Sequence, residues 1–231
     1  ALGSRGAALL KPYSDRPDTS GLLIAEHDAT LAILKQALKV RAQVAIHAIG
    51  DRGNRLALDW IEEAFASDPV AAKAVTWRIE HAQIIDPADI PRFAKLGVVA
   101  SMQPSHAIGD LYFAPARLGP DRLAGAYAWR SLMDSKARLA FGTDAPVEVG
   151  DPRIEFYAAV ARKDLAGRSD SGWGPEQALP RRWALAALTS GAAAAVQAIG
   201  GDLVRSMPAD ITVFSRDILT IVGGRIVSDR R

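Results

Sequence analysis

The chain has 231 residues, of which 49% are hydrophobic and 23% charged, and its 28 Lys and Arg nearly balance 26 Asp and Glu. This composition is typical of a globular protein and excludes disorder as the main state. There is no run of basic residues, so nucleic acid is not expected as a partner, and the absence of cysteine excludes disulfides, thiolate metal sites and cysteine nucleophiles. Any metal must be held by histidine and carboxylate side chains.

The sequence contains no uninterrupted apolar stretch of eighteen residues, because Thr189, Ser190, Gly191 and Gln197 break the Ala-rich segment near the C-terminus. We therefore expect no membrane span and no membrane partner. The opening residues lack an initiator Met and any signal-peptide pattern, and we expect a cytoplasmic protein of which this sequence is part of a longer polypeptide.

Short apolar runs alternate with longer amphipathic ones between residues 28 and 147, which predicts strand–helix units on a parallel sheet. Helices are expected at 31–40, 56–65, 86–95 and 121–134. Strands are expected at 44–49, 76–81, 97–103 and 138–144. Four such units are half of an eightfold barrel.

The pattern changes after residue 147. Helices are predicted at 154–164 and 183–197, separated by a Gly/Ser/Pro-rich loop at 167–180. Strands are predicted at 209–214 and 221–227. We therefore divide the chain into residues 1–200, the barrel portion, and residues 201–231, strands of a small appended β-structure.

His47, His81 and Asp144 each stand at or near the C-terminal end of an expected parallel strand. Barrel enzymes place their reacting groups at this edge, where residues distant in sequence converge. Imidazole and carboxylate are suitable ligands for zinc and related divalent ions, which lower the pKa of a bound water to roughly 7. A single histidine at a strand end also has an ordinary explanation as a hydrogen-bonded structural residue. Together the three predict a site for a divalent metal, with zinc as the expected ion.

Two further polar residues follow the third expected strand. Gln103 and His106 lie on the same edge as the proposed metal site, where they are candidates for substrate binding. For His106, a substrate-contact or oxyanion role and a hydrogen bond that stabilises the loop are equally consistent with the sequence. His27 stands at an expected helix start, where capping and solvent exposure explain it. Arg78 and Glu80 share one parity of their strand, which favours a structural ion pair over catalysis.

The segments around the three predicted ligands resemble those of the metal-dependent amidohydrolase superfamily, in particular its YtcJ-like branch, which includes N-substituted formamide deformylase. They are His47-Ala-Ile-Gly-Asp-Arg-Gly, Arg78-Ile-Glu-His-Ala-Gln and Phe141-Gly-Thr-Asp-Ala-Pro. Leu2-Gly-Ser-Arg-Gly, Ser101-Met-Gln-Pro-Ser-His and Val222-Gly-Gly-Arg-Ile-Val extend the likeness over nearly the whole chain.

This resemblance implies a metal-dependent hydrolase with a (β/α)8 TIM barrel, of which only the later strand–helix units are present, and with a small appended β-sandwich. It implies that His47, His81 and Asp144 bind metal. It also implies that Asp144 is catalytic, as the proton shuttle when metal-activated water cleaves a C–N bond of an amide, N-acyl or N-formyl small molecule. The superfamily's first-strand His-x-His pair and fourth-strand ligand do not occur in these 231 residues.

Two alternatives follow. The chain could be a non-catalytic barrel fragment or regulatory relative without a complete metal site, and a possible homodimer would then pair its open strand edges. Within the same superfamily, the reaction could instead be hydrolysis of a cyclic amide or deamination of a ring, because the same activated water attacks any suitably placed sp² carbon.

Overall fold

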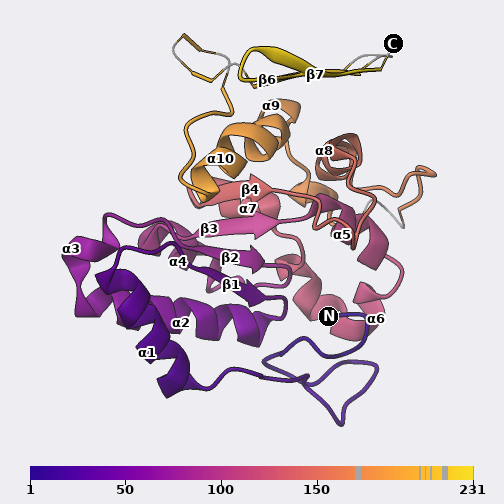
Figure 1. Ribbon diagram of the computed structural model, residues 1–231. Helices are drawn as coiled ribbons and strands as arrows, with labels where there is room; N and C mark the ends of the chain where they lie inside the picture. Colours follow the sequence, from indigo (N-terminus) through magenta and orange to yellow (C-terminus); the bar gives the residue numbers. More distant parts are fainter. Residues whose placement is uncertain (170–172, 203, 206, 209, 215–217, 231) are drawn as a thin grey trace.

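The chain forms an α/β fold around four short parallel strands in the order β1-β2-β3-β4 (Figure 1). The structure is a computed structural model and describes residues 1–231 except 170–172, 203, 206, 209, 215–217 and 231. The strands are β1 (Ala45–Ala48), β2 (Arg78–His81), β3 (Val99–Met102) and β4 (Arg138–Phe141). Each pairs in parallel with the next strand along the chain, so the predicted succession of strand–helix units is confirmed.

The helices of this part follow the predicted periodicity. Helix α2 carries Leu58, Ile61 and Ala64 on one face, all fully buried. Helix α4 ends at Gly97, whose φ of +67° provides the left-handed C-cap that glycine favours. The helices are α1 (His27–Lys39), α2 (Asp51–Ser67), α3 (Pro69–Ala72), α4 (Ile90–Leu96), α5 (Pro104–Asp110), α6 (Ala114–Leu118) and α7 (Trp129–Asp134).

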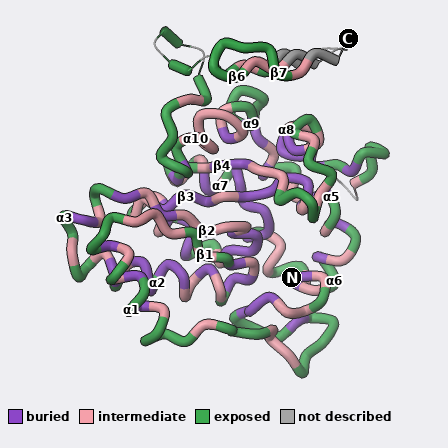
Figure 2. Tube along the Cα trace, viewed as in Figure 1, coloured by how far each residue is buried: buried purple, intermediate pink, exposed green. Residues whose placement is uncertain are grey.

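The two faces of the parallel sheet carry different side chains. Ile79, Ala100 and Phe141 belong to the main core, which lies where the helices pack on the sheet (Figure 2). Arg78 and Glu80 alternate with these residues and form an ion pair with each other, as predicted.

The predicted helix at 121–134 is wrong in its first half. The segment begins as a 3₁₀ helix (Pro120–Gly125), breaks, and becomes helical again only in α7. The break occurs because the backbone pairs with the segment after β2: Ile85 N–H donates to Gly125 O (2.9 Å) and Tyr127 N–H donates to Gln83 O (2.7 Å). These long-range bonds override the local helical pattern.

The second predicted helical region also differs from the prediction. After α8 (Pro152–Ala161) and a 3₁₀ turn (Pro175–Gln177), residues 183–197 do not form one helix. The segment divides into α9 (Arg181–Ala186), a π-helical turn (Ala187–Gly191) and α10 (Ala192–Ala195). Gly191, at the end of the π-helical turn, packs closely against β4, since a Cβ there would lie 2.3 Å from Leu139 O. Residues 170–172 of the predicted loop lie outside the described residues.

The C-terminal part forms a second, antiparallel sheet in the order β5-β6-β7. Its strands are β5 (Ile211–Phe214), β6 (Ile218–Val222) and β7 (Arg225–Arg230). The single strand predicted at 221–227 is wrong, because Gly223 and Gly224 have φ of +55° and +77° and turn the chain back on itself. Ala209, the first residue of the other predicted strand, lies outside the described residues. The division of the chain near residue 200 stays a prediction.

None of the helices in the described part of the chain has the length and hydropathy that crossing a bilayer requires.

Candidate metal centre

Four histidine and carboxylate side chains meet at the carboxyl edge of the parallel sheet. His47 lies in β1, His81 is the last residue of β2, and Asp144 follows β4 by three residues. His106 lies in α5, directly after β3, and not in an irregular loop. His81 and Asp144 have left-handed backbone conformations, with φ of +73° and +56°. Such strain is common where a fold holds a functional side chain in one orientation.

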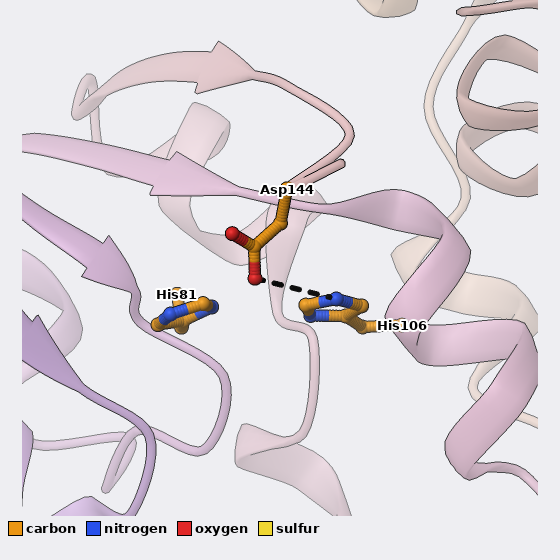
Figure 3. Close-up of side chains that lie close together, drawn as sticks. All are labelled: His81, His106 and Asp144. Carbon is orange, nitrogen blue, oxygen red and sulfur yellow. Dashed lines mark ion pairs between the residues drawn. The ribbon is translucent and has the colours of Figure 1, made fainter. Parts of the chain in front are cut away.

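Three of these side chains point toward a common centre. Each of His81, His106 and Asp144 offers a ligand atom within 4.8 Å of the other two. Figure 3 shows the Asp144 carboxylate directed toward the space between the two imidazole rings. Asp144 Oδ2 lies 3.9 Å from His106 Nε2, and the ring centroids of His81 and His106 are 5.7 Å apart. The fold therefore juxtaposes two imidazoles and one carboxylate from three strand–helix units.

His47 lies at the margin of this group. Its ring packs edge-on against that of His81, with the centroids 4.6 Å apart. Burial and the neighbouring His81 lower the pKa of His47, while the nearby Asp144 carboxylate acts in the opposite direction. Of the three residues predicted as ligands, the structure brings His81 and Asp144 together, with His47 beside His81 and outside the group of three. The third member is His106, for which we predicted substrate contact.

Gln103 contacts His81. Gln103 Oε1 lies 2.9 Å from His81 Nδ1, and the Gln103 side chain is buried. Because an amide oxygen only accepts hydrogen bonds, the contact places the proton on Nδ1 and leaves the Nε2 lone pair free for another partner.

The surroundings of His106 indicate whether a divalent cation fits at this centre. Its Nε2 is buried and has no hydrogen-bond partner among the described residues. Burial lowers the pKa of His106 to about 4, so its imidazole is neutral at pH 7. Carboxylates of Asp144 and Glu148 face Nε2 at 3.9 and 3.6 Å, which is too far for hydrogen bonds. A neutral imidazole beside carboxylates, with a second imidazole close by, is a donor set that suits a divalent cation.

A buried polar network supports the helix that carries His106. Asp110, four residues later in α5, accepts hydrogen bonds from Tyr127 Oη (2.6 Å) and Gln83 Nε2 (2.7 Å). Burial raises the pKa of Asp110 to about 6. The network joins α5, the segment after β2 and the break before α7, and so fixes His106 relative to His81.

Several polar residues near the centre were not predicted from the sequence. Glu148 is four residues after Asp144, and this proximity in the chain is the signal that could have indicated it. Glu155 of α8 is buried and accepts a hydrogen bond from Ser105 N–H at 2.8 Å. No local pattern indicates Glu155 or Asp110, because their roles depend on packing between distant segments.

Comparison with known proteins identifies similar chains. Residues 1–230 match the model of the "Amidohydrolase family". The chain is 31% identical to YtcJ of Bacillus subtilis over 223 residues, which are 96% of this chain and 41% of that protein. It is 28% identical to N-substituted formamide deformylase of Arthrobacter pascens over 134 residues, 57% of this chain and 24% of that protein.

A solved structure gives the same result for the fold. An uncharacterized metal-dependent hydrolase from Pyrococcus furiosus is 33% identical and superposes with a TM-score of 0.78, covering 90% of this chain and 41% of that one. The strand–helix units are accordingly those of an amidohydrolase TIM barrel, as the resemblance implied. The chain spans about two fifths of the length of YtcJ and of the Pyrococcus protein.

Proposed function

Because the chain belongs to the amidohydrolase family, we propose that it acts as a metal-dependent hydrolase that cleaves a C–N bond of an amide, N-acyl or N-formyl small molecule. The observation that carries the proposal is the convergence of ligand atoms from His81, His106 and Asp144 within 4.8 Å at the carboxyl edge of the sheet. Barrel enzymes perform their chemistry at that edge. The match to N-substituted formamide deformylase supports amide-type substrates.

The residues that would hold a divalent cation, with zinc as the expected ion, are His81, His106 and Asp144. His47, whose ring lies against His81, is a fourth candidate ligand. A cation bound there would lower the pKa of water and polarise a carbonyl oxygen. Gln103 fixes the orientation of His81 through Nδ1, so that its Nε2 is available to the centre.

Asp144 is the proton shuttle in this proposal. Its carboxylate is exposed at the sheet edge and lies next to the two imidazoles, so it can reach both an attacking water and the nitrogen of the bond being cleaved. Asp144 would accept a proton from the water and then donate it to the leaving nitrogen. Such acid–base catalysis contributes about 10²–10⁴-fold to rate.

The test is hydrolysis by the full-length protein of a panel of N-formyl amines, N-acyl amines and cyclic amides. We expect turnover of at least one N-formyl or N-acyl amine, and a loss of about 10²–10⁴-fold in kcat for Asp144→Asn. Asp134→Asn, an exposed carboxylate of α7, is the control and should retain activity. Undiminished hydrolysis by Asp144→Asn would contradict the assignment, and turnover of cyclic amides alone would favour the alternative reaction.

A further inference from the structure

A cavity of about 180 Å³ lies between α5 and α8, next to the candidate metal centre. Ser105 and Ile108 of α5, Glu148 of the loop after β4, and Ile154 and Glu155 of α8 contribute to its lining. Glu148 connects the two sites, because its Oε1 lies 3.6 Å from His106 Nε2. The cavity and the centre are therefore neighbours that share the Glu148 side chain.

The lining is acidic and contains no basic side chain. Two of its four carboxylates are neutralised by arginines, Asp151 by Arg153 at 2.6 Å and Asp164 by Arg168 at 3.0 Å. Glu148 and Glu155 have no Lys or Arg partner within the described part of the chain. Glu148 therefore borders the cavity without a counter-charge from lysine or arginine, and Glu155 lies buried in the cavity wall.

Burial raises the pKa of both Glu148 and Glu155, because it disfavours their charged forms. Glu155 is 1% exposed, and Ser105, which donates its N–H to Glu155 Oε2, is 4% exposed. Ser105 Oγ lies beside the same carboxylate and is buried. Ionised carboxyls in such surroundings are stabilised by a donor that carries positive charge, and the cavity has room for one beside Glu148.

The apolar part of the lining decides what kind of cation fits. Ile108 is buried and Ile154 partly buried, and both contribute hydrocarbon surface beside the carboxylates. A bare metal ion would gain nothing from that surface, whereas an alkylammonium group would bury its methylenes there. Cavities near 150 Å³ hold about six heavy atoms, as benzene does, so the size suits an aminoalkyl chain of about four carbons.

We propose that this cavity binds the ammonium-bearing alkyl chain of the substrate, so that the preferred substrates are N-formyl or N-acyl derivatives of diamines. The inference rests on the proposed hydrolase function for its reaction, and on the cavity for its selectivity. Glu148 and Glu155 are the residues that determine this specificity, because they supply the charge that recognises the ammonium.

The test compares N-formyl-1,4-diaminobutane with N-formylpentylamine, in which a methyl group replaces the ammonium. We expect the wild-type protein to favour the charged substrate by at least about tenfold in kcat/KM, since a hydrogen bond to a charged group is worth about 1.5–3 kcal/mol. Glu148→Gln should reduce this ratio at least severalfold. Glu155→Gln, which keeps an acceptor for Ser105 N–H, is the second variant and should also reduce the ratio. Glu63→Gln changes an exposed glutamate of α2 and should keep the wild-type ratio.

Binding of n-butylammonium, measured by calorimetry on the same variants, separates this inference from the proposed function. If no formamide is hydrolysed but n-butylammonium binds and Glu148→Gln weakens it, the cavity assignment stands and the proposed reaction is wrong. If the neutral substrate is hydrolysed as well as the charged one, or if Glu148→Gln leaves the ratio unchanged, the cavity assignment is overturned and the hydrolase proposal stands.

Discussion

Gln103 Oε1 lies 2.9 Å from His81 Nδ1, so a buried amide that directly follows β3 orients an imidazole at the end of β2. The two strands are hydrogen-bonded neighbours, and the contact crosses from one strand–helix unit to the next. Outer partners of this kind typically change metal affinity by 10–100-fold when they are removed.

We therefore predict that Gln103→Leu weakens zinc binding by about 10–100-fold, because His81 loses the acceptor that fixes its tautomer. Titration with a competing chelator measures the affinity. Gln103→Glu retains an acceptor oxygen and should bind more tightly than Gln103→Leu. Wild-type affinity in Gln103→Leu would show that this contact does not orient a ligand.

The carboxyl of Asp110 should make stability depend on pH. Burial raises its pKa to about 6, so the folded protein holds this proton at pH values where the unfolded chain has released it. Asp110 contributes its full share to the free energy of unfolding below about pH 4. That share falls by roughly 2–3 kcal/mol as the pH rises through 6. Asp110→Asn should flatten the free energy of unfolding between pH 4 and 6, measured by urea denaturation. An unchanged slope would contradict this role.

Gly125 should tolerate no side chain. A Cβ there would lie 1.8 Å from Ile85 O, which is backbone and cannot move without breaking the pairing after β2. We expect Gly125→Ala to destabilise the protein by at least about 2 kcal/mol in chemical denaturation. Gly109→Ala is the matched control, because nothing lies within 4 Å of its Cβ position in α5. Equal stability of both variants would contradict the close approach.

The buried Arg162 guanidinium makes hydrogen bonds to the backbone of two other segments of the chain. It donates to Tyr127 O (3.0 Å) and Trp173 O (3.1 Å), lies 4.4 Å from the Trp129 ring centroid, and is 1% exposed. Arg162→Lys cannot reproduce the forked geometry and should cost about 2–4 kcal/mol of stability. Arg130→Lys, at an exposed position of α7, should cost less than about 0.5 kcal/mol. A thermal melt that does not distinguish the two variants would show that the fork is dispensable.

The sequence predicts those parts of the fold in which local pattern and tertiary structure agree. The four parallel strands are recognised because each is a short apolar run before a glycine-rich or polar turn, and α4 because Gly97 ends it. The same reasoning placed His47, His81 and Asp144 on one edge, since parallel strands bring their carboxyl ends together.

The failures occur where distant segments determine the backbone. Tyr127 belongs to an apparent helix, yet its N–H pairs with Gln83 O across 44 positions of sequence. Gly191 looks like an ordinary interruption of an Ala-rich helix, and its function becomes visible only when Leu139 O lies against it. His106 likewise reaches the centre through the packing of α5, which Asp110 ties to Tyr127.

The most direct test of the account is the zinc affinity of the full-length protein measured for His81→Ala, His106→Ala and Asp144→Asn, with His27→Ala as control. His27 is exposed and bonded to Asp28 and Glu63, away from the centre. We predict that each of the three substitutions raises the Kd at one zinc site by at least about tenfold, because two remove an imidazole ligand and the third removes the carboxylate charge. His27→Ala should leave the Kd unchanged. Equal affinity in all four variants would contradict a shared cation at His81, His106 and Asp144.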